Sequence, residues 1–478
     1  MIVTGPPLAL YLLLAAPAAG ATLSLVPVAG VARVASRLAA LVAVAAALGL
    51  LVTAAAGRWG PYLGVDALSD LFLFTVTAIY ATSVWYSDRY LRAVDRPFLT
   101  PQVYYALLSA FAFTMISALL VTDLGLMWIG IEATTVSSAL LVVLERRPTS
   151  VEAAWRYTLI ASAGLTIALF ALLLLYTDTG TLDAVRLAAM PPATTLPVLM
   201  AVALALVGYG TKVGLFPMHT WLPDAHSEAP SPISAMFSGV LLPTALYAFL
   251  RVYRVLGTAP PTSIRDLLLA FGLTTAVVGA FLLQGQRSYK RMFAYSSMEV
   301  MGLTLTGVAI GGIALYGALL LIVAHAFVKS AAFYCSGNVL RATGTTRIEE
   351  VRDLRARLPW TGGAWVLASL GVTGAPPFGT FLGELLIVVG AVAVGEIWVA
   401  VVVVAAILLA FVGVNGQVGR MVFGESATPT VRAPRGADGG AAIPYLNVAV
   451  ALALGVASLP YLTPIVRSAA VLLGGSVP

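Results

Sequence analysis

The sequence predicts an all-α protein that crosses a membrane many times. Hydrophobic residues make up 60% of its 478 residues, charged residues only 10%, and the mean hydropathy is +0.96. A soluble globular protein carries roughly 25% charged residues. The few charges lie mostly between long apolar runs, which is typical of a polytopic helical membrane protein.

Apolar runs of about 20 residues are long enough to cross the hydrocarbon core as helices. About fourteen such spans are predicted, over residues 5–28, 33–56, 67–91, 102–121, 123–144, 155–176, 196–217, 230–253, 265–285, 290–311, 313–340, 361–394, 397–421 and 442–468. We expect four parts. They are 1–93 with spans 1–3, 94–256 with spans 4–8, 257–422 with spans 9–13, and 423–478 with a loop and span 14.

The basic residues predict the orientation of these spans. Of the 27 Lys and Arg residues, nineteen lie in or beside loops that follow odd-numbered spans and five in loops that follow even-numbered ones. The positive-inside rule then places both termini on the outer side of a prokaryotic cytoplasmic membrane. The arginines form no separate basic domain, so the net charge of +6 does not indicate a nucleic-acid partner.

The cysteine content limits the cofactor chemistry. A single cysteine, Cys335, excludes an internal disulfide and any iron–sulfur or zinc site built from cysteines of this chain. We expect no cofactor and no redox centre in the chain itself.

Most charged residues fall in loops or towards the ends of the predicted spans. Six ionisable residues cannot be assigned to loops and lie inside spans, where a charge costs at least about 2.5–3.5 kcal/mol and normally faces the bundle interior. They are Glu132, Lys212, Glu299, His325, Lys329 and Glu384. His325 and Lys329 are four positions apart, which places both on one helix face. Static ion pairs that fix helix packing are the alternative interpretation. Both signs of charge together with a histidine favour a proton relay.

Two of the predicted spans contain helix breakers. Gly214 and Pro217 interrupt span 7, and Pro376 and Pro377 interrupt span 12. Broken helices at membrane depth occur only where the freed backbone is covered by protein or lines a watery cavity. The breaks are five spans apart, and an odd offset reverses direction across the membrane. Spans 4–8 and 9–13 are therefore predicted to be inverted repeats, as in many transporters.

Two motifs near the first break have competing interpretations. The string VGYG occurs in potassium-channel filters, but Lys212 two residues later would repel a cation. Asp224, His226 and Glu228 are metal-ligand residue types whose spacing matches no known metal motif. We expect this stretch to form a surface or helix-capping element without a metal. His219, just past the break, is a plausible next carrier for a proton.

Four stretches resemble the proton-translocating, antiporter-like membrane subunits of respiratory complex I, Mrp antiporters and group-4 [NiFe] hydrogenases. They are KVGLFPMHTWLPDAHSEAPSPISAMFSGVLL, YKRMFAYSSMEVMG, HAFVKSAAFYCSGN and GAPPFGTFLGELLI. The residues of these stretches are most similar to those of the hydrogenase-4 or formate hydrogenlyase branch of this family. The resemblance implies partners in a multi-subunit redox complex, namely other antiporter-like subunits and a peripheral redox module.

The resemblance also implies roles for single residues. Glu132 and Lys212 would form a switchable pair, and His325, Lys329 and Glu384 would continue the relay, with Glu299 and His219 as further steps. Complex I relatives usually have a lysine in span 8 where this chain has Pro243, so the central route differs. Two other functions stay open: a sodium/proton antiporter subunit of Mrp type, and a passive membrane anchor for a soluble redox enzyme.

Overall fold

The computed structural model describes residues 7–28, 30–53, 56–92, 94, 97–145, 147–258, 260–425, 437–456 and 462–475. Its first half contains α1 (Leu8–Ser24), α2 (Val31–Thr53), the hairpin β1 (Gly57–Trp59) and β2 (Leu63–Val65), α3 (Ala67–Leu91), α4 (Pro101–Leu120), α5 (Leu124–Val142), α6 (Pro148–Thr179), α7 (Ala184–Ala189), α8 (Leu196–Val213), η1 (Met218–Thr220), α9 (Trp221–Glu228), α10 (Ser231–Met236), the π-helical turn η2 (Phe237–Leu241), α11 (Leu242–Tyr253) and η3 (Arg254–Leu256).

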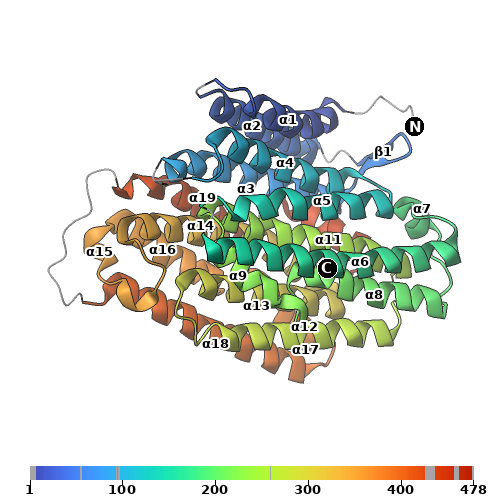
Figure 1. Cartoon of the computed structure of the whole chain (residues 1–478). Coiled ribbons are helices and arrows are strands. Elements are labelled where there is room, and N and C mark those ends of the chain that lie inside the picture. The colour runs from blue at the N-terminus through green and yellow to red at the C-terminus, as the bar shows by residue number, and fades with distance from the viewer. Residues whose placement is uncertain are drawn as a thin grey trace.

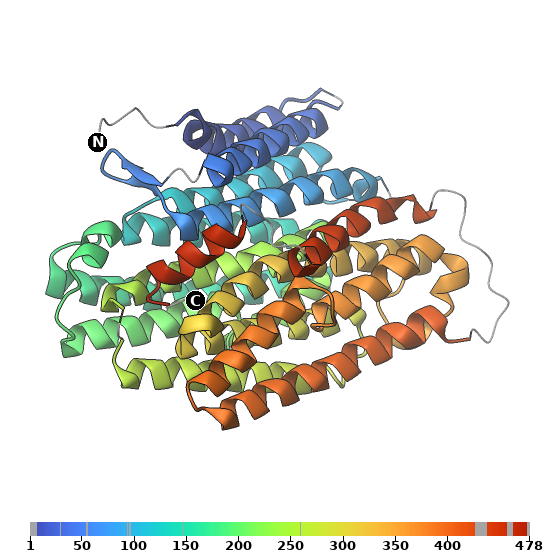
Figure 2. The same cartoon turned by 180° about the vertical axis from the view of Figure 1, so that it is seen from behind.

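The second half contains α12 (Thr262–Leu282), α13 (Tyr289–Ile310), α14 (Gly312–Thr343), η4 (Ile348–Glu350), α15 (Leu354–Arg357), α16 (Pro359–Val372), α17 (Gly379–Ala393), α18 (Ile397–Phe423), η5 (Ala437–Ala441), α19 (Ala442–Val456) and α20 (Leu462–Leu472). Figure 1 shows the long helices side by side, with α1 and α2 at one edge of the bundle and α17 and α18 at the opposite edge. Figure 2 shows α19 and α20, in red, on the face turned away in Figure 1, where α19 packs on α14 and α20 on α3.

The prediction of an all-α polytopic membrane protein is confirmed. Among the described residues, twelve segments are long and apolar enough to cross a membrane, and three further apolar helices are shorter. Helix occupies each of the fourteen predicted ranges, although the count of fourteen, the four-part division and the inverted repeats stay predictions. Two helices, α19 and α20, occupy the range predicted as one final span.

Both predicted helix interruptions are confirmed. In the seventh range α8 ends at Val213, and the chain passes through η1 before α9 begins. In the twelfth range α16 ends at Val372 and α17 begins at Gly379. The predicted part boundary at 93 lies outside the described residues. So do four basic residues that contribute to the predicted orientation: Arg96, Arg146, Arg432 and Arg435.

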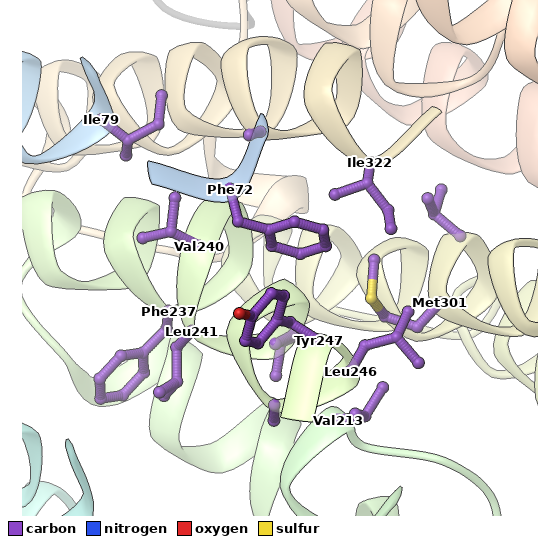
Figure 3. Close-up of a cluster of buried hydrophobic side chains, with 14 of the residues drawn as sticks. Phe72, Ile79, Val213, Phe237, Val240, Leu241, Leu246, Tyr247, Met301 and Ile322 are labelled. Atoms are coloured by element: carbon purple, nitrogen blue, oxygen red, sulfur yellow. The ribbon is translucent and has the colours of Figure 1, made fainter. Parts of the chain in front are cut away.

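Buried apolar side chains run through the whole bundle, and Figure 3 shows one cluster of them, formed by residues of α3, α8, η2, α11, α13 and α14. Phe72 of α3 and Tyr247 of α11 pack there with their ring centroids 5.3 Å apart. Val213 of α8, Met301 of α13 and Ile322 of α14 surround them and are fully buried or nearly so. Packing of this kind drives helix association in a bilayer, where lipid tails are as apolar as the side chains. The core holds the end of α8, and with it Lys212, in the middle of the bundle.

Candidate functional site

Lys212 lies in the last turn of α8 and is completely buried. Its Nζ donates hydrogen bonds to Thr135 Oγ1 on α5 and, over 3.1 Å, to the hydroxyl of Tyr157 on α6. The ring of Tyr157 also lies below the ammonium, 5.2 Å from Nζ to its centroid. A buried ammonium needs such partners because its desolvation is costly. Three helices therefore build one pocket for this cation.

Glu132 lies on α5, three residues before Thr135, and Ser162 Oγ of α6 donates to its Oε1 over 2.6 Å. Its other oxygen, Oε2, is buried and has no hydrogen-bond partner among the described residues. Within that part of the chain, no ion pair shorter than 4.0 Å joins Glu132 to Lys212. The expected pair is thus open here: each charge is held by hydroxyl groups, and the carboxylate keeps one free acceptor.

The first helix break is built by the residues that follow Lys212. Gly214 has a φ of 82°, in the left-handed region, and the peptide bond before Pro217 is cis. Trp221 Nε1 donates to the carbonyl oxygen of Thr211 over 2.7 Å, which supplies one of the partners that the interrupted helix lacks. Polar backbone is therefore exposed to the bundle interior directly beside the buried ammonium.

A second group of polar residues lies between α13 and α14. Lys329 is completely buried, and its Nζ donates to the carbonyl oxygen of Phe293, over 3.0 Å, and to Ser296 Oγ. His325, one turn earlier on α14, is also fully buried, and neither ring nitrogen has a partner in the described part of the chain. Glu299 lies on α13 with 2% of its surface exposed, close enough to Lys329 for their charges to interact.

The second break brings Glu384 to this group. Gly374 has a φ of 64°, and a Cβ added at this position would overlap the Glu384 carboxylate, which therefore lies directly over the break. Glu384 is 4% exposed and close enough to Glu299 for the two charges to interact. We call Glu132 and Lys212 the first cluster, and Glu299, His325, Lys329 and Glu384 the second cluster. Each contains a buried lysine and borders one helix break.

His219 follows the first break in η1 and is nearly buried. Its ring lies 5.7 Å from that of Phe216 and 6.4 Å from that of Tyr295 on α13. Its Nδ1 has no partner among the described residues. Tyr295 is one turn from Glu299, so the structure brings His219 towards the second cluster.

The expectation of a surface element over Asp224–Glu228 is wrong for His226. Asp224 does lie at the surface, where it pairs with Arg156 and Arg291. His226 is completely buried, with its Nδ1 2.8 Å from the carbonyl oxygen of Leu222 and its Nε2 without a partner in the described part of the chain. In the sequence, the apolar Leu222 one helical turn earlier is the signal that places His226 on the inner face of α9.

Lys290 is a second buried residue that the sequence did not predict, because its neighbours in the sequence are polar. It is the first residue of the predicted span 290–311 and counts among the basic residues beside a loop. In the structure it lies in the first turn of α13, is 1% exposed, and donates to the carbonyl oxygen of Ala229 over 2.5 Å. Ala229 is the residue after α9, so the lysine satisfies a carbonyl at the end of that helix. Nothing in the local sequence separates it from the neighbouring surface residue Arg291.

Comparison with known proteins decides the family. The model of the family described as NADH:quinone oxidoreductase/Mrp antiporter, TM, matches residues 121–410, which is more than half of the chain and contains both clusters. The chain belongs to this NADH:quinone oxidoreductase/Mrp antiporter family. The resemblance noted in the sequence is confirmed.

Individual members of the antiporter family support the same assignment. The chain is 36% identical to the Hydrogenase-4 component F homolog of Methylacidiphilum infernorum over 70% of this chain and 73% of that protein. It is 32% identical to NADH-quinone oxidoreductase subunit N of Desulforudis audaxviator over 74% of this chain and 71% of that protein. A chain of the membrane-bound sulfane sulfur reductase, an archaeal respiratory membrane complex, shares the fold with a TM-score of 0.88 at 24% identity, over 98% of both chains.

Proposed function

We propose that this chain translocates protons as a membrane subunit of a multi-subunit redox complex of hydrogenase-4 or complex I type. The observation that carries the proposal is the pair of clusters, each with a fully buried lysine next to a broken helix. Buried charges at membrane depth are costly, and they mark ion pathways more often than they stabilise a fold. Driving energy comes from partner subunits with a redox centre, and the partners include other antiporter-like subunits.

The first cluster supplies the switch. With Glu132 held by Ser162 and Lys212 held by Thr135 and Tyr157, the two charges have an open arrangement. Closing the pair to about 5 Å is worth about 3 kcal/mol at an effective dielectric constant of 20. Moving one proton against 100 mV costs about 2.3 kcal/mol. One opening and closing step is therefore large enough to drive one proton off the Lys212 ammonium.

The second cluster takes up the proton. We propose that it passes from Lys212 by way of His219 and ordered water towards Glu299, and then among His325, Lys329 and Glu384. His226 lies between the clusters, with its ring 6.1 Å from Trp221 and 6.0 Å from Phe333. Its unpartnered Nε2 makes it a further candidate for this bridge. The route follows the middle of the membrane, with both termini on the outer side of a prokaryotic cytoplasmic membrane.

The test is proton translocation by the intact complex in vesicles. Lys212→Ala and Glu132→Ala are expected to abolish coupled translocation while the complex still assembles, because each removes one charge of the switch. Arg186→Gln is the matched control, since Arg186 is an exposed cation on α7 at the surface. Unchanged translocation in Lys212→Ala would refute the assignment.

Two rival functions give different results in the same vesicles. A sodium/proton antiporter subunit of Mrp type requires that proton movement depend on a sodium gradient. A passive anchor for a soluble redox enzyme requires that charge-removing changes at Glu132, Lys212 and Glu384 leave coupling intact and alter only the amount of assembled complex.

A further inference from the structure

Three arginines converge on one carboxylate at the end of the bundle where α2 begins and α3 ends. Asp88 Oδ1 lies 3.2 Å from Arg33, and its Oδ2 lies 3.1 Å from Arg37 and 3.0 Å from Arg92. Three positive charges therefore face one negative charge. The site is positively charged overall. Asp88, Arg33 and Arg37 are partly covered by protein, and Arg92 is exposed.

Several hydrogen-bond donors at this place lack an acceptor. The Nε atoms of Arg33 and Arg37 are buried and have no partner among the described residues. The hydroxyl of Tyr105, a residue that is only 3% exposed, has none either. Unsatisfied buried donors are rare, because each has lost its hydrogen bonds to water without gaining a partner. Together they indicate an acceptor that binds here from outside the chain.

A cavity of about 290 Å³ lies at these donors. Arg33, Arg92 and Tyr105 line it, and Gln102 contributes from the first turn of α4. The start of α4 adds partial positive charge, which favours an anion, although Pro101 has no N–H and Thr100 already caps the N–H of Val103. The chemistry of the cavity matches a phosphate group, whose oxygens accept hydrogen bonds from several guanidinium groups at once.

Hydroxyl groups of three helices form a buried network next to the arginines. Ser36 of α2, which lies between the two arginines, is 3.1 Å from Ser109 of α4 through their Oγ atoms. Tyr80 of α3 donates to the same Ser109 over 2.8 Å. The arginines therefore project from a connected frame and not from a loose loop.

An exposed apolar stripe begins beside the arginines and continues along α2. Val34, Leu38, Leu41, Leu48 and Val52 recur at helical spacing and are each between 39% and 57% exposed. Arg33 and Arg37 are one residue away from the first two. A polar, cationic cavity at the end of a helix above an apolar stripe has the layout of a phospholipid, with its headgroup and acyl chains.

We propose that this cavity binds the phosphate group of an anionic membrane lipid whose acyl chains lie along the exposed stripe of α2. The lipid satisfies the buried donors and balances the excess positive charge. It also joins α2 to α3 and α4 at their common end. Free phosphate offers the same headgroup chemistry but has no chains to cover the stripe.

The experiment measures lipid bound to the intact complex after delipidation and reconstitution into nanodiscs of phosphatidylglycerol or of phosphatidylcholine. Wild type is expected to retain phosphatidylglycerol at least tenfold more strongly, with a higher apparent melting temperature. Arg33→Gln with Arg37→Gln should abolish this preference. Arg186→Gln, at an exposed cation on α7, should leave it unchanged.

Asp88→Asn separates lipid binding from a merely structural ion cluster. It removes the negative charge and keeps all three arginines, so phosphatidylglycerol should bind severalfold more strongly. Weaker binding in this variant, or equal retention of both lipids by wild type, would overturn the proposal. Stabilisation by inorganic phosphate as large as that by phosphatidylglycerol would also overturn it, because the acyl chains would then contribute nothing.

Discussion

Gly374→Ala tests whether the carboxylate over the second helix break takes part in translocation. At a φ of 64°, an alanine costs about 1–2 kcal/mol relative to glycine. The new Cβ also overlaps the Glu384 carboxylate, which is the flexible end of its side chain and can move away at little cost in stability. The expected result is therefore a modest loss of stability together with a misplaced carboxylate.

Gly395→Ala provides the matched control. Gly395 has a φ of 83°, so alanine carries the same backbone cost, but nothing lies within 4 Å of a Cβ at this position. Both variants should lose about 1–2 kcal/mol of stability. Only Gly374→Ala should lose translocation, by about tenfold to a hundredfold, because a displacement of about 1 Å in a reacting group has effects of that size.

The assays are the apparent melting temperature at a fixed scan rate and the initial rate of coupled proton movement in vesicles. A double variant completes the cycle. If Gly374→Ala acts through Glu384, adding it to Glu384→Ala should cause no further loss of translocation. Equal translocation in Gly374→Ala and Gly395→Ala would refute the reasoning, and so would an additive loss in the double variant.

Three further predictions concern buried polar contacts. Thr135→Val keeps the shape of the side chain but removes one acceptor of Lys212, and it should slow translocation about tenfold, since a hydrogen bond to a charged group is worth about 1.5–3 kcal/mol. Asp66→Asn keeps an oxygen for the helix cap but replaces the acceptor Oδ2 with an NH2 group and removes the negative charge that pairs with Arg251, and it should destabilise the protein by roughly 3 kcal/mol. Burial alone would raise the pKa of Asp66, but Arg251 beside it holds that pKa well below its usual range. The advantage of wild type over Asp66→Asn in thermal stability should therefore be constant above about pH 4 and shrink as the pH falls further. Lys290→Met leaves a buried carbonyl at the end of α9 without its donor, and it should lower thermal stability by about 1–3 kcal/mol without stopping translocation.

Hydropathy predicts the fold of this chain well because the bilayer imposes one length on every span. Helix lies in each predicted range, and both interruptions occur at the glycines and prolines from which they were predicted. The end of the chain is predicted less well. Residues 442–468 read as one apolar run, but the chain forms two helices there, of which α19 packs mainly on α14 and α20 mainly on α3. The apolar composition of a segment predicts that it is buried or spans the membrane, but it does not predict which helix the segment packs against.

The candidate site was predictable where a charge stands alone among apolar residues. Lys212, Lys329 and Glu384 are of this kind, and all are buried. Lys290 and His226 were missed because each lies in a polar stretch whose other members do reach the surface. Only the tertiary contact, Lys290 with the end of α9, distinguishes a buried cation from its exposed neighbours.

Pro243 stands where the resemblance to complex I subunits implies a lysine, which raises the question of how the two clusters communicate. A proline cannot donate to the carbonyl four residues earlier and crowds it. The structure places a π-helical turn, Phe237–Leu241, directly before this proline, and such turns widen the backbone at functional sites. In that turn Ser238 shares a 2.6 Å hydrogen bond with Ser297 of α13, one residue from the Ser296 that binds Lys329. The hydroxyl pair thus lies beside the second cluster, in the turn that precedes Pro243. We expect Ser238→Ala with Ser297→Ala to slow translocation while both lysines stay buried. An unchanged rate would show that the hydroxyl pair is not part of the route between the clusters and would favour His226 in that role.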